Sequence, residues 1–128
     1  MRPDPRCERG SSTVLAVGLI AVLLTTTVAA FAVLSAIRAA HVARSAADLS
    51  ALAGAVVHQQ VPDDSASCAE ARRIALRHEV ELLTCSVDAG GVVTVTTSAP
   101  ITHRLPGVGP ERAEGRARAG PDPSDAIE

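Results

Sequence analysis

The sequence predicts an α+β protein: a long N-terminal transmembrane helix extended outside the membrane, then a small helix plus a two- or three-stranded antiparallel sheet. Three observations predict this layout. No charged side chain occurs between Arg9 and Arg38. Residues 38–60 are rich in alanine and contain no proline. Beyond Pro62, a helix-capping pattern is followed by β-branched runs on both sides of a glycine-rich turn.

The charge-free run, residues 11–37, is long enough to cross a bilayer. As a helix it measures roughly 40 Å, more than the ~30 Å of a hydrocarbon core. Three fates are open to it: a permanent single span, a signal peptide that is removed, or a prepilin-type leader whose apolar helix is kept. Basic residues before the run and small residues within it fit a signal peptide: Arg2, Arg6, Arg9 and residues 28–30. The apolar stretch continues to Ile37, past an ordinary signal-peptide core, which favours a retained helix.

The run also defines the expected domains. Residues 1–10 form a cytoplasmic leader, residues 11–37 the transmembrane helix and residues 38–60 its exported extension. Residues 61–119 form a small exported α+β domain, and residues 120–128 a disordered tail. Positive charge is slightly more frequent before the span than just after it, which favours a cytoplasmic N-terminus. We therefore expect a single-pass protein of the inner (cytoplasmic) membrane whose C-terminal domain is extracytoplasmic.

The helix extension carries both large and small apolar residues. The large ones recur at intervals of three and four residues, with two wider gaps, and form an irregular apolar stripe: Leu34, Ile37, Val42, Leu49, Leu52 and Val56. Alanines dominate the remaining positions of residues 38–60. They either reflect helix propensity alone or allow another helix to approach closely.

A second, shorter helix is expected after Pro62. Proline has no amide donor, so the first helix ends there. Ser67 and Glu70 have the spacing of a capping box, which predicts that the second helix occupies about residues 68–83. Its arginines and glutamates are expected to face solvent.

A hairpin is expected next. β-branched residues at 84–87 and 92–97 flank the glycine-rich residues 88–91, a pattern typical of two antiparallel strands. Residues 116–119 alternate in polarity and are a weak candidate for a third, edge strand. The last residues are rich in Pro, Gly and charge, which predicts disorder from about Gly120.

Two of the three cysteines fall in the expected exported part. Cys7 precedes the span, Cys68 opens the second helix and Cys85 lies on the first strand. Thiols in an oxidising compartment, on elements that pack together, are disulfide candidates; the alternative is two independent buried cysteines. Closing a loop of about 18 residues would contribute roughly 3 kcal/mol. That is a large share of the stability of a domain without Phe, Trp or Tyr, because the one Phe of the chain, Phe31, lies in the span.

The sequence does not favour an enzyme, a metal site or a nucleic-acid partner. His78 begins a pattern like that of a zinc-protease helix, but Leu82 occupies the place of the second ligand. Gly107 and Gly109 lack a third glycine, because Arg112 stands there. The net charge is -2 and the basic residues are scattered. We expect no catalytic residue and no cofactor.

The ends of the long helix carry a family resemblance. Arg9 and Gly10 before the apolar run, together with the segment AADLSALAGA at residues 46–55, resemble the N-terminal region of TadE/TadG-like proteins of tight-adherence (Flp) pilus and secretion systems. The later pattern is similar to the short exported domain of compact TadE-like proteins: Cys68, Ala71, Ala75, Cys85, Val92 and Val95. The resemblance implies a minor pilin or pseudopilin-like component without catalytic activity. Its implied partners are the lipid bilayer and other Tad-type subunits, bound through the N-terminal helix.

The resemblance also concerns processing. Prepilin peptidase would cut after Gly10 and leave Ser11 as the new terminus. Its substrates usually carry Glu five residues after the cut, whereas Leu15 stands here. A major-subunit role is therefore not expected. The preferred function is a membrane-anchored accessory subunit of a Tad-type pilus or secretion apparatus. The alternative is a single-pass envelope anchor or sensor that binds an unrelated extracytoplasmic partner.

Overall fold

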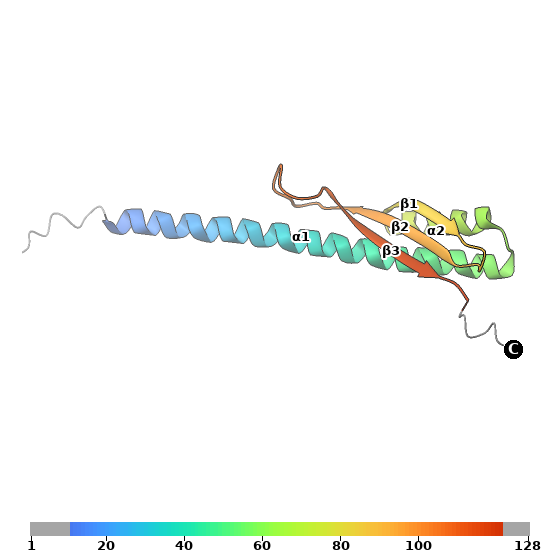
Figure 1. Cartoon of the computed structure of the whole chain (residues 1–128). Helices are drawn as coiled ribbons and strands as arrows, with labels where there is room; N and C mark the ends of the chain where they lie inside the picture. The colour runs from blue at the N-terminus through green and yellow to red at the C-terminus, as the bar shows by residue number, and fades with distance from the viewer. Residues whose placement is uncertain (1–10, 122–128) are drawn as a thin grey trace, which may run out of the picture.

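The computed structural model describes residues 11–121, which form two helices and three strands (Figure 1). In chain order the elements are α1 (Ser11–Gln60), α2 (Asp64–Arg77), β1 (Glu81–Val87), β2 (Val93–Pro100) and β3 (Arg112–Ala119). The strands form one antiparallel sheet in the order β1-β2-β3. The predicted α+β class, with its long N-terminal helix, small helix and antiparallel sheet, is confirmed.

The helix α1 is continuous over 50 residues, and only its C-terminal half carries the rest of the fold (Figure 1). There α2, β2 and β3 pack against it. The N-terminal half extends away from the sheet, and every side chain of residues 12–31 is exposed. This half is long and apolar enough to span a membrane.

The packed face of α1 is built from alanines. The most deeply buried ones have no exposed surface: Ala43, Ala46, Ala47 and Ala51. Ala47 and Ala51 share a core cluster with Val93 and Val95, the largest fully buried apolar side chains among the described residues. A core of alanine and valine buries little area per residue. The domain is therefore thinly packed, in keeping with its near lack of aromatic residues.

Small residues are required on the packed face of α1 because its backbone lies very close to the backbones of β3 and α2. A Cβ added to Gly115 of β3 would lie 2.4 Å from the carbonyl carbon of Ala43. A Cβ on Gly54 would lie 3.0 Å from the carbonyl oxygen of Ser67 in α2. Close to the Gly115 contact, the buried hydroxyl of Thr97 donates to the carbonyl oxygen of Ala43 at 2.7 Å. This close approach explains why α1 presents alanines to the sheet.

The second helix begins earlier than predicted. Its N-cap is Asp63, whose carboxylate accepts hydrogen bonds from the amides of Ser65 (2.8 Å) and Ala66 (3.3 Å). The Ser65 hydroxyl also donates to it, and these bonds hold the pKa of Asp63 below its usual value. The predicted cap, Ser67, is buried inside the helix and donates to the Asp63 carbonyl oxygen at 2.8 Å. The capping-box prediction is wrong because Asp63, next to Pro62, already caps the helix.

The second helix also ends earlier than predicted, at Arg77. Glu79 has a φ of 56°, a left-handed conformation typical of a helix C-terminus. Leu82 and Leu83, predicted as its last turn, lie on β1. A short apolar run fits both a helical and a strand period, so periodicity alone did not separate the two.

The hairpin is confirmed, and the third strand is longer than predicted. β1 pairs with β2, and Cys85 lies opposite Val95. β3 pairs with β2 over all eight of its residues, from Arg112 opposite Pro100 to Ala119 opposite Val93. The sheet is therefore three-stranded, with β2 at its centre. The predicted leader, residues 1–10, and residues 122–128 of the predicted disordered tail lie outside the described residues.

Candidate functional site

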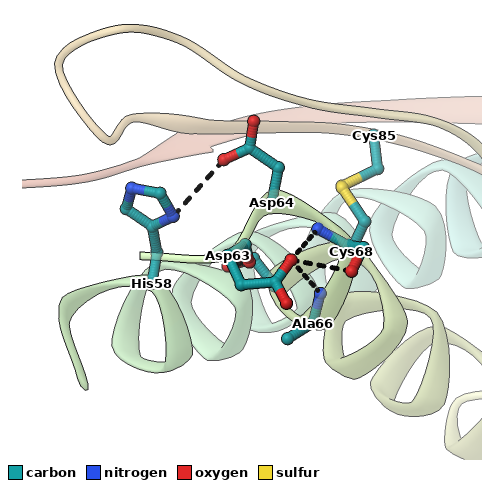
Figure 2. Close-up of a disulfide and its surroundings, with 8 residues drawn as sticks. His58, Asp63, Asp64, Ala66, Cys68 and Cys85 are labelled. Atoms are coloured by element: carbon teal, nitrogen blue, oxygen red, sulfur yellow. Dashed lines mark hydrogen bonds and ion pairs between the residues drawn. A yellow bond between two sulfur atoms is a disulfide. The ribbon is translucent and has the colours of Figure 1, made fainter. Parts of the chain in front are cut away.

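The structure joins Cys68 and Cys85 by a disulfide (Figure 2). Their Cα atoms are 5.8 Å apart, within the range that a disulfide needs. Cys68 belongs to α2 and Cys85 to β1. β1 is an edge strand of the sheet, with β2 as its neighbour in the sheet and α2 beside it. The disulfide therefore ties the outer strand of the sheet to the helix beside it.

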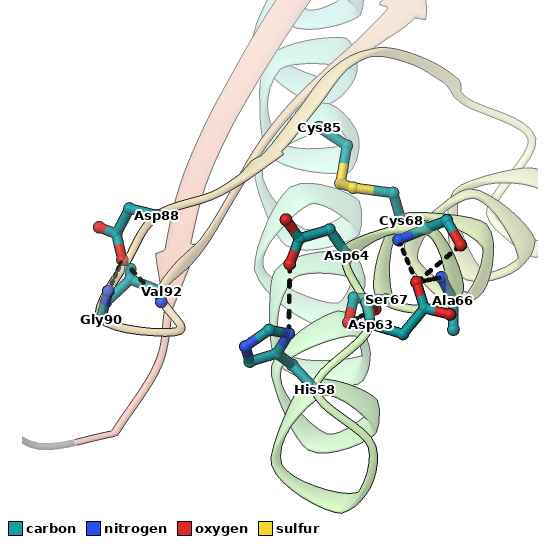
Figure 3. A network of polar contacts seen from close by, with 11 residues as sticks. His58, Asp63, Asp64, Ala66, Ser67, Cys68, Cys85, Asp88, Gly90 and Val92 are labelled. Atoms are coloured by element: carbon teal, nitrogen blue, oxygen red, sulfur yellow. Dashed lines mark hydrogen bonds and ion pairs between the residues drawn. A yellow bond between two sulfur atoms is a disulfide. The ribbon is translucent and has the colours of Figure 1, made fainter.

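A small polar cluster lies at the end of the domain where α1 finishes (Figure 3). Nδ1 of His58 lies 3.6 Å from Oδ1 of Asp64 at the start of α2, a contact that becomes an ion pair when His58 is protonated. The same ring lies against the β1–β2 turn, 3.1 Å from where a Cβ of Gly91 would be. In that turn, Asp88 accepts hydrogen bonds from the amides of Gly90 and Val92, both at 3.0 Å. The cluster joins α1, α2 and the hairpin, so its role is structural.

Over residues 11–121, no group of three or more His, Cys, Asp or Glu side chains is placed to hold an ion. His41 and His58 both lie on α1, well apart along the helix, whereas His78 follows α2 and His103 lies in the loop between β2 and β3.

Several large apolar side chains in the C-terminal half of α1 are exposed and do not belong to the core. Val42, Leu49, Leu52 and Val56, here called the α1 stripe, are between 38 % and 56 % exposed. Steps of seven, three and four residues place them along one side of the helix, the spacing of a seam between two helices. This row of exposed apolar side chains is a candidate interaction surface. The alanines do allow a close approach, but the chain's own sheet and α2 occupy that face.

The α1 stripe continues into the free half of the helix through Leu34 and Ile37, which are also exposed. Three consecutive threonines in this half, residues 25–27, all use their hydroxyl donors within the helix. Each donates to a carbonyl oxygen one turn earlier: Thr25 to Ala21 (3.0 Å), Thr26 to Val22 (2.9 Å) and Thr27 to Leu23 (2.7 Å). Hydroxyls satisfied in this way are tolerated in hydrocarbon. These threonines therefore do not prevent the free half from lying in lipid.

The predicted site residues divide into two groups. Cys68 and Cys85 are brought together, whereas Cys7 and the processing residue Gly10 lie outside the described residues. Ser11 is the first residue of α1. Sequence reasoning found the residues of the α1 stripe but not that they face outward. No protein-family model matches the chain, and neither a curated protein nor a solved structure does.

Proposed function

We propose that this protein is a membrane-anchored, minor pilin- or pseudopilin-like accessory subunit of a Tad-type (Flp) pilus or secretion apparatus. The α1 stripe carries the proposal. A subunit that assembles by helix packing needs large apolar side chains on the side of the helix that its own domain leaves open. The resemblance of residues 46–55 to TadE/TadG-like proteins gives this surface its context.

In this proposal α1 has two tasks. Its free half anchors the protein in the inner membrane, with the α+β domain on the extracytoplasmic side. The α1 stripe then packs against a helix of a neighbouring subunit, and no covalent bond is made or broken. A prepilin peptidase is a further proposed partner, which would cut between Gly10 and Ser11. Leu15 in place of the usual Glu is consistent with an accessory position in the assembly.

Burial of the α1 stripe gives too little free energy to bind a partner from solution, so the membrane anchor is needed for association. Burying a half-exposed Leu or Val contributes about 1 kcal/mol, so the four residues of the α1 stripe contribute about 4 kcal/mol. The loss of translational and rotational freedom when two proteins associate from solution costs about 4 kcal/mol or more. The stripe therefore holds a partner only when both helices are already confined to one bilayer, where the apolar halves add further contact.

Site-specific photocrosslinking tests this proposal. With a photoreactive amino acid in place of Leu52, we expect the full-length protein to crosslink in its native cells to a membrane subunit of the secretion apparatus. The same substitution at Arg44, exposed on another side of α1, should give no such product. A Leu52→Asp variant should lose the partner on co-purification while its domain stays resistant to protease.

Identification of the crosslinked protein decides between the two functions. A pilus or secretion subunit supports the proposal. An envelope protein unrelated to secretion would support the alternative, a single-pass anchor or sensor. Equal crosslinking from Leu52 and Arg44 would remove the α1 stripe as the binding surface.

A further inference from the structure

The loop between β2 and β3, residues 101–111, lies beside the apolar half of α1. It leaves the sheet toward the N-terminal half of the helix, and its tip turns away from the helix axis (Figure 1). The backbone amide of His103 donates to the hydroxyl of Ser35 at 3.0 Å. An open apolar hollow of about 540 Å³ lies between this loop and Val28, Phe31 and Ala32. The loop is therefore level with residues 28–35, inside the charge-free run.

The tip of this loop is apolar and uncharged. Residues 105–110 read Leu-Pro-Gly-Val-Gly-Pro, and Leu105 and Val108 are 41 % and 62 % exposed. Both glycines have a φ of 76°, which folds the tip into a compact turn. The two prolines have no amide donors to satisfy. At the base, Arg104 pairs with Glu111 at 2.6 Å, so the flanking charges neutralise each other.

The length of the charge-free run sets the depth of the loop. About 20 helical residues cross the hydrocarbon core, and the run is about seven residues longer. If the hydrocarbon begins near Ser12, it ends near Phe31, and Ser35 lies among the lipid headgroups. A deeper position would place unpaired loop backbone in hydrocarbon, which is not tolerated. The loop therefore meets the bilayer at its interface.

We propose that the β2–β3 loop docks on the bilayer surface that faces the domain, with Leu105 and Val108 inserted at the headgroup boundary. Lipid is the occupant because the loop tip is continuous with the lipid-facing surface of α1 and lies at interfacial depth. Spans are usually fixed at this depth by Trp and Tyr, and the chain has neither. The loop supplies the missing interfacial anchor and limits how far α1 sinks. This rests on α1 crossing the membrane, not on a role in a pilus.

Single-tryptophan fluorescence tests the docking, because the native chain has no Trp background. We would reconstitute the full chain in phosphatidylcholine–phosphatidylglycerol vesicles, with and without brominated phosphatidylcholine, which quenches Trp in contact with lipid. Three variants are compared: Val108→Trp in the loop, Leu24→Trp in the span and Ala89→Trp in the exposed β1–β2 turn at the far end of the domain. We expect Val108→Trp to lose most of its emission in brominated lipid and to shift to shorter wavelength. Ala89→Trp should do neither.

Each of the other outcomes is decisive. If Leu24→Trp is quenched while Val108→Trp behaves like Ala89→Trp, the loop does not dock on lipid, although α1 still spans the membrane. If Leu24→Trp is not quenched, α1 does not cross the membrane, and the proposed docking of the loop is wrong as well. Quenching at Val108 with no crosslink from Leu52 would support the loop and contradict the proposed assembly role. Leu105→Trp is a second loop position, and it should follow Val108→Trp.

Discussion

A Gly115→Ala variant is expected to lose about 3 kcal/mol or more of the free energy of unfolding of the α+β domain. The added Cβ would lie 2.4 Å from the carbonyl carbon of Ala43 and 2.5 Å from the amide nitrogen of Arg44. These are backbone atoms, so no change of side-chain rotamer relieves the overlap. The helix α1 must separate from β3, and the buried bond from Thr97 to the Ala43 carbonyl is strained with it.

Thermal unfolding of the purified protein in detergent measures this loss. For a domain of this size the midpoint should fall by about 12 °C or more. Gly18→Ala is the control, because a Cβ there meets nothing within 4 Å. A Gly115→Ala midpoint equal to that of the parent would show that α1 and β3 do not pack this closely.

Removal of the disulfide in a Cys68→Ser, Cys85→Ser double variant is expected to cost 2–5 kcal/mol, as is typical of roughly this loop length in small exported domains. The effect should be large because β1 is the edge strand, and the disulfide is its covalent link to α2. Without the bond, β1 keeps its ladder with β2, the packing of Leu82 on the core and the ion pair of Glu81 with Arg112. β1 should then be the first element opened and cleaved by protease.

Limited proteolysis with and without reductant checks this expectation, and mass spectrometry of the unreduced protein gives the pairing directly. Cys7→Ser is the matched control, and it should leave protease resistance unchanged. Free thiols at both positions in the unreduced protein, or a double variant as resistant as the parent, would remove the disulfide from the account.

The sequence predicts the continuity of α1 but not its orientation in the fold. No proline interrupts residues 11–60, so one long helix is expected. Hydrophobicity suggests that Leu49 and Leu52 face the core, yet the structure buries the alanines instead. The reason is distance: the backbone of β3 at Gly115 comes so close that only small side chains fit. Pattern analysis ranks residues by hydrophobicity and carries no information about such an approach.

The third strand and the β2–β3 loop also depend on tertiary contacts that the sequence pattern does not reveal. Residues 112–119 alternate arginine or glutamate with alanine and glycine, which are poor strand formers. They form a full strand because β2 offers an open edge and α1 packs against Gly115. No local signal in residues 101–111 indicates that the loop contacts Ser35, since that contact depends on tertiary structure alone.

We propose that α1 crosses the membrane once and places the α+β domain outside the cytoplasm. Reporter fusions after Gln60 test this topology most directly. We expect an active alkaline phosphatase, which folds only outside the cytoplasm, and a silent cytoplasmic reporter at the same junction. A silent phosphatase with an active cytoplasmic reporter would contradict the claim.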